Sequence, residues 1–561
     1  MALRHWLQAF TTLPCFFPTI GAQSSPGIIP PAQVIIPETT AANGPLLELE
    51  RVQLTNAVID RIANENVTSS IADLVGFDHN GTTVDHNFTA CKMFPGDALW
   101  PSQSHLNVFD ALLNDGLVPT VPIASPCYDS NWGPKDVAKC NSVVSSFTKF
   151  PIHYLGKSTG AGSIALWMHN IKDIIFLPSY EFEGYAGKAF KVGAGVTLSE
   201  IYRAADAHGV TVLGGICPSV GYAVGYLQGG GHTPLSGFHG MGADAVLAYQ
   251  VVTADGRYVT ASKTSYPDLF WALRGGGPGT FGIVTSVIVK AFPETDVTLS
   301  SFVLGNSTDG TQFVSRANFF KVLRVLWESF PAWTDANTYS FFFVFNTNGQ
   351  LTLDMRNFFA PGHTPGSYNN LTKPFFYTVK KFGLATSLPG NRLVPKTMWN
   401  NPENFEVLWK TVVAHVEAGH HFGIYHQAPD NPQNVDNAVS SAWRNAQSFF
   451  ITKSANFPEN ASATVISEAN RALHEQILQP WRDITPASKG GGSYLNEAAV
   501  DEPNWKEDFY GAQYERLVMI KRKYDPTGVF YATTAIGSDE WEIRGAPDLG
   551  VTTQNGRLCR V

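Results

Sequence analysis

The sequence is poor in charge and has no long uncharged apolar run. Asp, Glu, Lys and Arg make up only 15% of the 561 residues, and their formal net charge is −8. A disordered chain of this length would carry more charge and fewer apolar residues. A nucleic-acid-binding chain would carry a positive surplus, because phosphate neutralisation dominates that affinity. The lack of an apolar run of about 18 residues argues against a membrane-spanning helix.

Cysteine is also scarce, with six residues in the chain. A mostly apolar stretch from Trp6 to Ile20 follows a short basic start, which predicts a secretory signal peptide over residues 1–22. Its removal would take away Cys15, and a separate role for Cys217 leaves four cysteines with three alternative pairings. An oxidising compartment would permit such bridges. These four are Cys91, Cys127, Cys140 and Cys559.

Sequons for N-glycosylation are spread along the chain and agree with secretion without establishing it. They stand at Asn66, Asn80, Asn87, Asn306, Asn370 and Asn460.

Glycine and proline, in contrast, are abundant, with 50 and 35 residues. At about 100–200 residues per domain, the length predicts two or more domains. Residues 23–45 are rich in Pro, Ala and Thr and are typical of a linker. Gly and Pro residues that interrupt helices and strands are frequent up to residue 294. Residues 295–488 contain more aromatic side chains, which favours a second domain with a sheet and helices.

The local patterns mix helices with hairpins and so predict an α+β fold rather than a regular βαβ array. A helix is expected to begin at Thr197, where Glu200 completes a capping box. Residues 246–260 alternate and turn at Asp255-Gly256, which predicts a hairpin. Further expected elements are helical periodicity over 46–71, strands over 189–192, 210–213 and 282–292, and helices over 268–273 and 508–523.

The first glycine-rich segment runs from Tyr154 to Ser163 and reads YLGKSTGAGS. Successive backbone amides of such a run can converge on one anion, which is typical of a pyrophosphate site. The segment lacks the Walker A order, so it does not indicate nucleotide triphosphate hydrolysis. A flexible surface turn is the alternative interpretation. The candidate binding residues are Gly156, Lys157, Ser158, Thr159, Gly160, Ala161, Gly162 and Ser163.

The second segment, Gly214 to Ser236, contains GGICPSVG and QGGGH. Its single cysteine, Cys217, fits neither a CxxC redox motif nor zinc-ligand spacing, so no metal site is predicted. The pattern favours a fixed, accessible thiol beside a flat ligand. The alternative is a buried structural cysteine. Glycines let backbone approach such a ligand closely, and the candidates are Gly221, Gly229, Gly230 and Gly231.

Three shorter segments follow: Arg274 to Gly282, Tyr494 to Glu497, and Tyr524 to Phe530. A dinucleotide-binding Rossmann site was the competing interpretation of the glycines. Gly193-Ala-Gly195 follows a strand and precedes a helix, but Leu198 stands where the third glycine is needed. A nicotinamide-dependent dehydrogenase is therefore disfavoured.

Taken in order, these five segments resemble the FAD-linked oxidases of the vanillyl-alcohol-oxidase superfamily. Within it they are most similar to the berberine-bridge-enzyme-like group and its isoamyl-alcohol-oxidase-like members. The resemblance runs from about Thr89 to Trp541 and is strongest from Leu213 to Pro293. It implies an α+β fold: a two-part PCMH-type FAD-binding domain around an α+β substrate domain with an antiparallel sheet covered by helices. The implied boundaries are 46–294 for the FAD-binding domain, 295–488 for the substrate domain, and 489–561 for a C-terminal segment that returns to the FAD-binding domain.

The resemblance also implies a cofactor and its contacts. FAD would be covalently bound through Cys217, and its pyrophosphate would lie on the loop from Gly156 to Ser163. His153 is a candidate for a second link to the flavin 8α-methyl group. His232, which follows the triple glycine, and Tyr494 are the implied catalytic residues that accept or share a substrate proton.

The implied activity is that of a secreted oxidase. Hydride would pass from an alcohol or a secondary metabolite to flavin N5, and dioxygen would reoxidise the flavin. The expected partners are therefore a small-molecule substrate and dioxygen, with no nucleic acid and no membrane span. The stretch between Cys127 and Asp136 is shorter than is usual in this family. This leaves an alternative open, a cofactor-free secreted glycoprotein that keeps the fold without catalysis.

Overall fold

The computed structural model describes most of the chain. The described ranges are 45–77, 91–118, 121–130, 132–147, 160–305, 315–379, 391–395, 397–420, 422–454, 461–546, 548, 550 and 552–561. The predicted signal peptide and nearly all of the predicted linker lie outside them. The chain forms two compact units: a small one with Thr55–Gly76 and Pro101–Thr120, and a large one with Val121–Val561 and the stretches Ile35–Leu54 and Phe77–Trp100.

The small unit is helical. α1 (Asn56–Asn64) begins where Thr55 is extended and its hydroxyl accepts a backbone hydrogen bond from the first turn. Ser102 caps α2 (Gln103–Leu112) in the same way. The helical periodicity over 46–71 is therefore divided, because the extended residue starts a new helix. In addition to α1, residues 46–71 form two 3₁₀ helices. Ser69–Leu74 belongs to the small unit, and Glu48–Arg51 belongs to the large unit.

The first sheet of the large unit is antiparallel. Its five strands are β1 (Ile174–Phe182), β2 (Tyr185–Gly193), β6 (Ile283–Lys290), β4 (Val246–Val252) and β5 (Tyr258–Ser262), in that spatial order. The turn between β1 and β2 places Glu183 and Gly184 at positive φ, as a tight two-residue hairpin turn requires. The hairpin predicted at Asp255-Gly256 is confirmed as the β4–β5 pair. A two-stranded sheet joins β3 (Val210–Thr211) to β7 (Phe292–Pro293).

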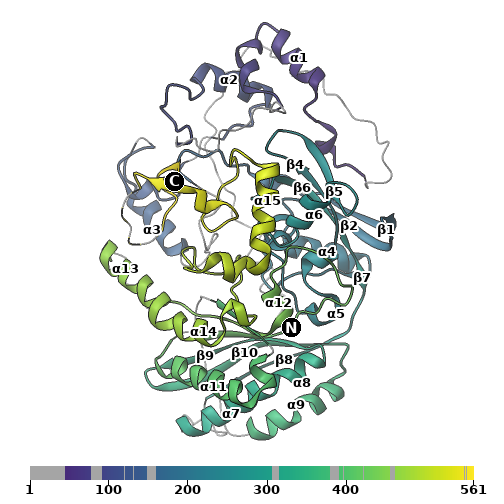
Figure 1. Ribbon diagram of the computed structural model, residues 1–561, viewed down its shortest axis with the longest axis vertical. Coiled ribbons are helices and arrows are strands. Elements are labelled where there is room, and N and C mark those ends of the chain that lie inside the picture. Colours follow the sequence, from purple (N-terminus) through teal and green to yellow (C-terminus); the bar gives the residue numbers. More distant parts are fainter. Residues whose placement is uncertain are drawn as a thin grey trace. The chain divides into compact units, whose positions relative to one another are not determined.

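Helices pack on this sheet and bring the end of the chain back to it. α4 (Leu198–Ala207), α6 (Pro267–Ala272) and α15 (Tyr514–Tyr524) contribute to one buried apolar cluster with β2 and β6. In Figure 1 the yellow α15 lies beside α6. The predicted capping box of α4 is confirmed, since Glu200 Oε2 accepts from the Thr197 amide at 2.7 Å.

The second sheet has six antiparallel strands in the order β11-β13-β12-β9-β10-β8. Side chains alternate between its two faces. Ile424 and Phe450 pack in one cluster with the covering helices, whereas Tyr425 and Phe449 belong to an aromatic cluster on the other face. Ile216, from the Cys217 segment, packs against this aromatic cluster. The strands are β8 (Val297–Leu304), β9 (Tyr339–Thr347), β10 (Gln350–Pro361), β11 (Asn391–Pro395), β12 (Phe422–His426) and β13 (Ala446–Ile451).

Helices cover one face of the second sheet, as Figure 1 shows for α7, α8, α9 and α11. Antiparallel sheets with packed helices confirm the predicted α+β fold. These helices are α7 (Arg316–Glu328), α8 (Phe330–Asp335), α9 (Pro365–Val379) and α11 (Pro402–Glu417). The remaining elements of the large unit are α3 (Val137–Phe147), α5 (Ser236–His239), α10 (Thr397–Asn400), α12 (Ser441–Asn445), α13 (Ala463–Ala472), α14 (Gln479–Ile484), β14 (Trp541–Arg544) and β15 (Arg557–Arg560).

One predicted helix, over 508–523, is interrupted. The chain forms a π-helical turn at Lys506–Tyr510 and a 3₁₀ turn at Gly511–Gln513 before α15 begins. Gly511 has a φ of 56°, which a regular right-handed helix does not permit. The apolar periodicity of the segment did not reveal this break.

Two disulfides select one of the three pairings that the sequence left open. Cys91 is bonded to Cys559, and Cys127 to Cys140. Cys217 is the free cysteine of the described chain. Among the described residues, no helix combines the length and hydropathy that a membrane crossing needs.

A buried ion pair joins the 3₁₀ helix Glu48–Arg51 to the first sheet. Lys191 Nζ of β2 lies 2.5 Å from Glu50 Oε2, and both side chains are fully buried. The other carboxylate oxygen accepts hydrogen bonds from the hydroxyls of Thr285 and Ser286 on β6. Each polar atom of this carboxylate is thus compensated, which buried charge requires.

Replacing Lys191 with Met should destabilise the protein by about 3–5 kcal/mol, because the Glu50 carboxylate would stay buried without its counter-charge. The double variant Glu50→Gln, Lys191→Met should recover part of the loss. Thermal unfolding of the three proteins measures this. Arg471→Met is the control, since its exposed pair with Glu475 should contribute less than about 1 kcal/mol. An unfolding midpoint of the Lys191→Met protein equal to that of the wild type would contradict the prediction.

Candidate functional site

The segment that carries Cys217 is held by the start of α4. The amides of Leu198 and Ser199 donate to the carbonyls of Val220 and Pro218 at 2.9 and 3.0 Å. Cys217 itself is exposed, which rules out the alternative of a buried structural cysteine. Desolvation of the thiol by surrounding atoms, and then the Glu497 carboxylate, raise the pKa of Cys217.

The triple glycine packs against protein side chains. A Cβ on Gly229 would lie 2.0 Å from Asn496 Nδ2, and one on Gly231 would lie 2.8 Å from the Tyr226 ring. The sequence-based reason for these glycines was close approach to a flat ligand. The structure gives them a further reason, because only glycine leaves room for Asn496 and Tyr226.

His232 is buried in a cage of aromatic rings. Its imidazole stacks on Trp443 with centroids 5.4 Å apart and an interplanar angle of 21°. Tyr425, Phe449 and Tyr494 complete the cage at 5.4–5.7 Å. Two of these rings stand on the aromatic face of the second sheet. Among the described residues, His232 Nδ1 has no hydrogen-bond partner.

Tyr494 is fixed by the residue two positions further on. Asn496 Nδ2 donates to the Tyr494 hydroxyl and to the Gly225 carbonyl, both at 2.9 Å. Burial, and then the charge of Glu497, raise the pKa of Tyr494 above its usual value of 10.0. Tyr494 is therefore a neutral phenol at neutral pH.

Glu497 lies between the predicted site residues. Its Oε1 is 3.6 Å from His232 Nε2, and its charge raises the pKa of Cys217, Tyr494 and Tyr339. The structure thus brings Cys217, His232 and Tyr494 together around one carboxylate. Sequence reasoning named the Tyr494–Glu497 motif but gave Glu497 no role. It also missed Tyr339, Tyr425 and Trp443, which come from the second sheet and the helix beside it.

Only half of the predicted pyrophosphate loop is described. His153, Gly156, Lys157, Ser158 and Thr159 lie outside the described residues, so their predicted roles stay predictions. In the described half, Gly160 N and Ser163 N bond within the loop, to Ser163 Oγ and Gly160 O. The Ala161 amide donates to the Gln554 carbonyl at 3.0 Å. These three amides thus have partners from the protein itself.

Unpartnered buried polar atoms test whether the site fits a flavin. The Gln228 side chain is fully buried, and neither its amide nitrogen nor its amide oxygen has a partner in the described part of the chain. The same holds for His232 Nδ1, Glu497 Oε2 and Tyr339 Oη. A flavin, whose ring carries both donors and acceptors, and a substrate hydroxyl group beside it would together satisfy such a mixed set. Within the described ranges, no group of three or more His, Cys, Asp or Glu side chains could hold a metal ion.

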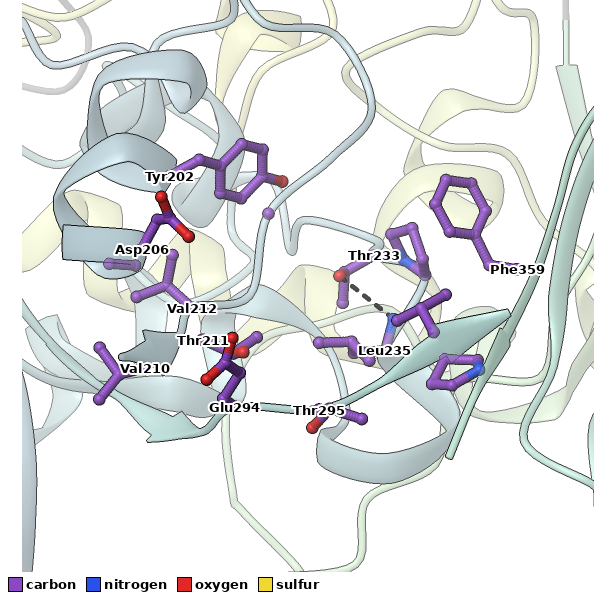
Figure 2. A pocket seen from close by; sticks show the side chains of 15 residues that line it. Tyr202, Asp206, Val210, Thr211, Val212, Thr233, Leu235, Glu294, Thr295 and Phe359 are labelled. Carbon is purple, nitrogen blue, oxygen red and sulfur yellow. Dashed lines mark hydrogen bonds between the residues drawn. The ribbon is translucent and has the colours of Figure 1, made fainter. Parts of the chain in front are cut away.

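A cavity of about 330 Å³ lies next to this cluster but does not include it. Figure 2 shows Tyr202 and Asp206 of α4 on one side and Phe359 of β10 on the other. Thr233 and Leu235, which follow His232 in the chain, also line it. None of Cys217, His232, Tyr494 and Glu497 does, so the chemical groups locate the site better than this cavity.

The chain matches known families at both parts of the cluster. The FAD binding domain family matches residues 152–262, and the berberine and berberine-like family matches residues 493–537. The first range contains Cys217 and His232, and the second contains Tyr494 and Glu497.

Relatives cover most of the chain. FAD-linked oxidoreductase patO of Aspergillus clavatus is 32% identical over 84% of this chain and 95% of its own length. VAO-type flavoprotein oxidase VAO615 of Thermothelomyces thermophilus is 30% identical over 86% of this chain and 97% of its own. The crystal structure of VAO-type flavoprotein MtVAO615 from Myceliophthora thermophila superposes with a TM-score of 0.71, 26% identity, and coverage of 84% of this chain and 100% of that one. The protein is therefore an enzyme that belongs to the FAD-linked oxidoreductases of the VAO-type, berberine-bridge-enzyme-like family.

Proposed function

We propose that the enzyme is a secreted oxidase that removes hydride from the carbon of an alcohol, of the kind found in secondary metabolites, with dioxygen as the final electron acceptor. The observation that carries this proposal is the convergence of Cys217, His232 and Tyr494 around Glu497. It combines a point of attachment for a flavin with groups that can bind and relay a substrate proton. The names of the relatives, FAD-linked oxidoreductase and flavoprotein oxidase, support the same chemistry.

FAD, when bound, supplies the acceptor for hydride. The chain supplies orientation, exclusion of water and proton transfer. The rings of Trp443, Tyr425 and Phe449 shield His232 from water, and His232 is only 6% exposed. Tyr494, as a neutral phenol held by Asn496, can donate a hydrogen bond to a substrate oxygen.

The residues that would hold FAD are Gln228 and the backbone at Gly221 and Gly229–Gly231. Pyrophosphate binding by the loop from Gly156 to Ser163 stays a prediction, because the amides of Gly160, Ala161 and Ser163 have partners in the protein. We further propose that Cys217 bonds through sulfur to flavin C6. The bond replaces the hydrogen on sulfur and the hydrogen on the ring carbon. Two electrons and two protons therefore leave, and dioxygen takes them up. A second link through His153 stays a prediction.

Secretion is supported by the disulfides Cys91–Cys559 and Cys127–Cys140, because such bridges persist in oxidising compartments. Simple alcohol oxidation and oxidative ring closure both begin with removal of hydride. The aromatic face of the second sheet would distinguish their substrates.

The wild-type protein should be yellow, and its flavin should stay with the polypeptide after acid precipitation. Peptide mass spectrometry should find the flavin mass on the peptide that contains Cys217. Cys217→Ala should lose this modified peptide and keep its fold. A flavin located on another peptide in both proteins would refute the role of Cys217, and a purified wild type without flavin bands would favour the cofactor-free alternative.

Gln228→Met should lower the flavin content of purified protein. The substitution keeps the side-chain volume but removes two buried polar atoms that have no partner in the described part of the chain and could bind the flavin. The ratio of flavin to protein absorbance measures the change. Gln479→Met, an exposed substitution on α14, is the control and should leave the ratio unchanged. Full flavin occupancy in Gln228→Met would show that this amide does not contact the cofactor.

Hydrogen peroxide release tests the oxidase activity directly. The wild-type protein, mixed with a panel of alcohols, sugars and aromatic amines in air, should produce peroxide with at least one alcohol. Anaerobic mixing with the same alcohol should bleach the flavin absorbance. Bleaching without peroxide formation in air would exclude dioxygen as the acceptor.

A further inference from the structure

Glu497 differs from the other buried carboxylates for which partners are resolved. Its Oε2 is buried and has no hydrogen-bond partner in the described part of the chain, and its Oε1 is 3.6 Å from His232 Nε2, beyond hydrogen-bond length. Structural carboxylates in the same large unit bind cations and hydrogen-bond donors directly. They are Glu50 with Lys191, Asp244 with Arg444, Glu502 with Arg482, and Asp525 with Lys521.

Among the described residues, no hydrogen bond to its carboxylate makes Glu497 a structural anchor. The segment is held by its neighbours instead: Asn496 bonds Gly225, and the Ser493 amide donates to the Asp508 carbonyl at 2.8 Å. A carboxylate that is partly desolvated and left without donors costs stability. Such a group is expected where it acts on a ligand.

Tyr494 is poorly suited to accept a proton. Its oxygen already accepts a hydrogen bond from Asn496 Nδ2 and one from the Gly231 backbone. Burial and the neighbouring Glu497 charge keep the phenol protonated. The His232 ring is stacked on Trp443, and the nitrogen that lies nearest the carboxylate is Nε2. The other nitrogen, Nδ1, is on the opposite side of the ring from this contact. The free lone pairs of Glu497 Oε2 are therefore the best placed to receive a proton.

We propose that Glu497 is the catalytic base of the oxidation, with Oε2 as the atom that takes the substrate's hydroxyl proton. This inference rests on the proposed function. The substrate O–H bond breaks and an O–H bond forms at Oε2. FAD, when bound, would accept the adjacent C–H hydrogen with its electron pair, so that the substrate C–O bond would become a carbonyl.

The surroundings of Glu497 agree with this role. The titratable groups that face it are His232, Cys217, Tyr339 and Tyr494. With the phenols protonated and Cys217 bonded to the flavin, no anion competes with Glu497 for the proton. Its side chain keeps 27% exposure although Oε2 is buried.

The test compares Glu497→Gln with Glu507→Gln, an exposed glutamate of the same C-terminal segment. Both are holoproteins mixed anaerobically with the alcohol that reduces the wild type. Flavin reduction should be at least about 100-fold slower in Glu497→Gln and unchanged in Glu507→Gln, with equal flavin content. Tyr494→Phe should slow flavin reduction less than Glu497→Gln does. The reverse order of the two rates overturns the proposal.

A second readout needs no substrate. Nuclear magnetic resonance of histidine-labelled holoprotein should show changed imidazole resonances for His232 in Glu497→Gln, because the carboxylate oxygen 3.6 Å from Nε2 is altered. Glu507→Gln should show no change. A wild-type flavin that no alcohol reduces overturns the proposed function. Flavin reduction as fast in Glu497→Gln as in the wild type, at equal flavin content, overturns the Glu497 assignment by itself.

Discussion

One side-chain amide connects the two parts of the site. Asn496 Nδ2 bridges the Gly225 carbonyl and the Tyr494 hydroxyl, and it fits only because Gly229 has no Cβ. The contact joins residues 271 positions apart in the chain. Together with the bond from the Ser493 amide to the Asp508 carbonyl, it positions the Tyr494–Glu497 turn beside His232. The proposed proton transfer therefore depends in part on this contact.

A second connection fixes the aromatic wall. Asp244 accepts two hydrogen bonds from the Arg444 guanidinium, at 2.6 and 2.7 Å, and a third from Asn437. Such bidentate pairs fix geometry as well as charge. Trp443, adjacent to Arg444 in the chain, consequently stacks on His232. The backbone around Asp244, which follows the triple glycine, and the segment around Arg444, beside the second sheet, are thus held in a fixed relative position.

Local patterns predicted the local elements well. The Asp255-Gly256 turn and the Thr197–Glu200 capping box act within a few residues, so sequence alone could place them. Cys217, His232 and Tyr494 could be named because their motifs resemble a known family. Glu497 could not be singled out, since its meaning depends on an oxygen left without donors. The break at Gly511 was equally hidden, because apolar periodicity does not record φ.

The aromatic residues of the second sheet that surround His232 could not be predicted without tertiary information. Whether Tyr425 or Ile424 faces the site depends on strand register, and a shift of one residue would exchange them. No short motif encodes that register. The same limit explains why four cysteines could be counted but not paired.

The Cys91–Cys559 bond closes residues 91–559 into a covalent ring. A protease that cuts once anywhere inside this ring leaves two ends that are still covalently joined. Under oxidising conditions, a nicked molecule would keep its mass and its two halves would stay at high local concentration. Surface loops of this enzyme can therefore be cleaved without the loss of either part of the active site.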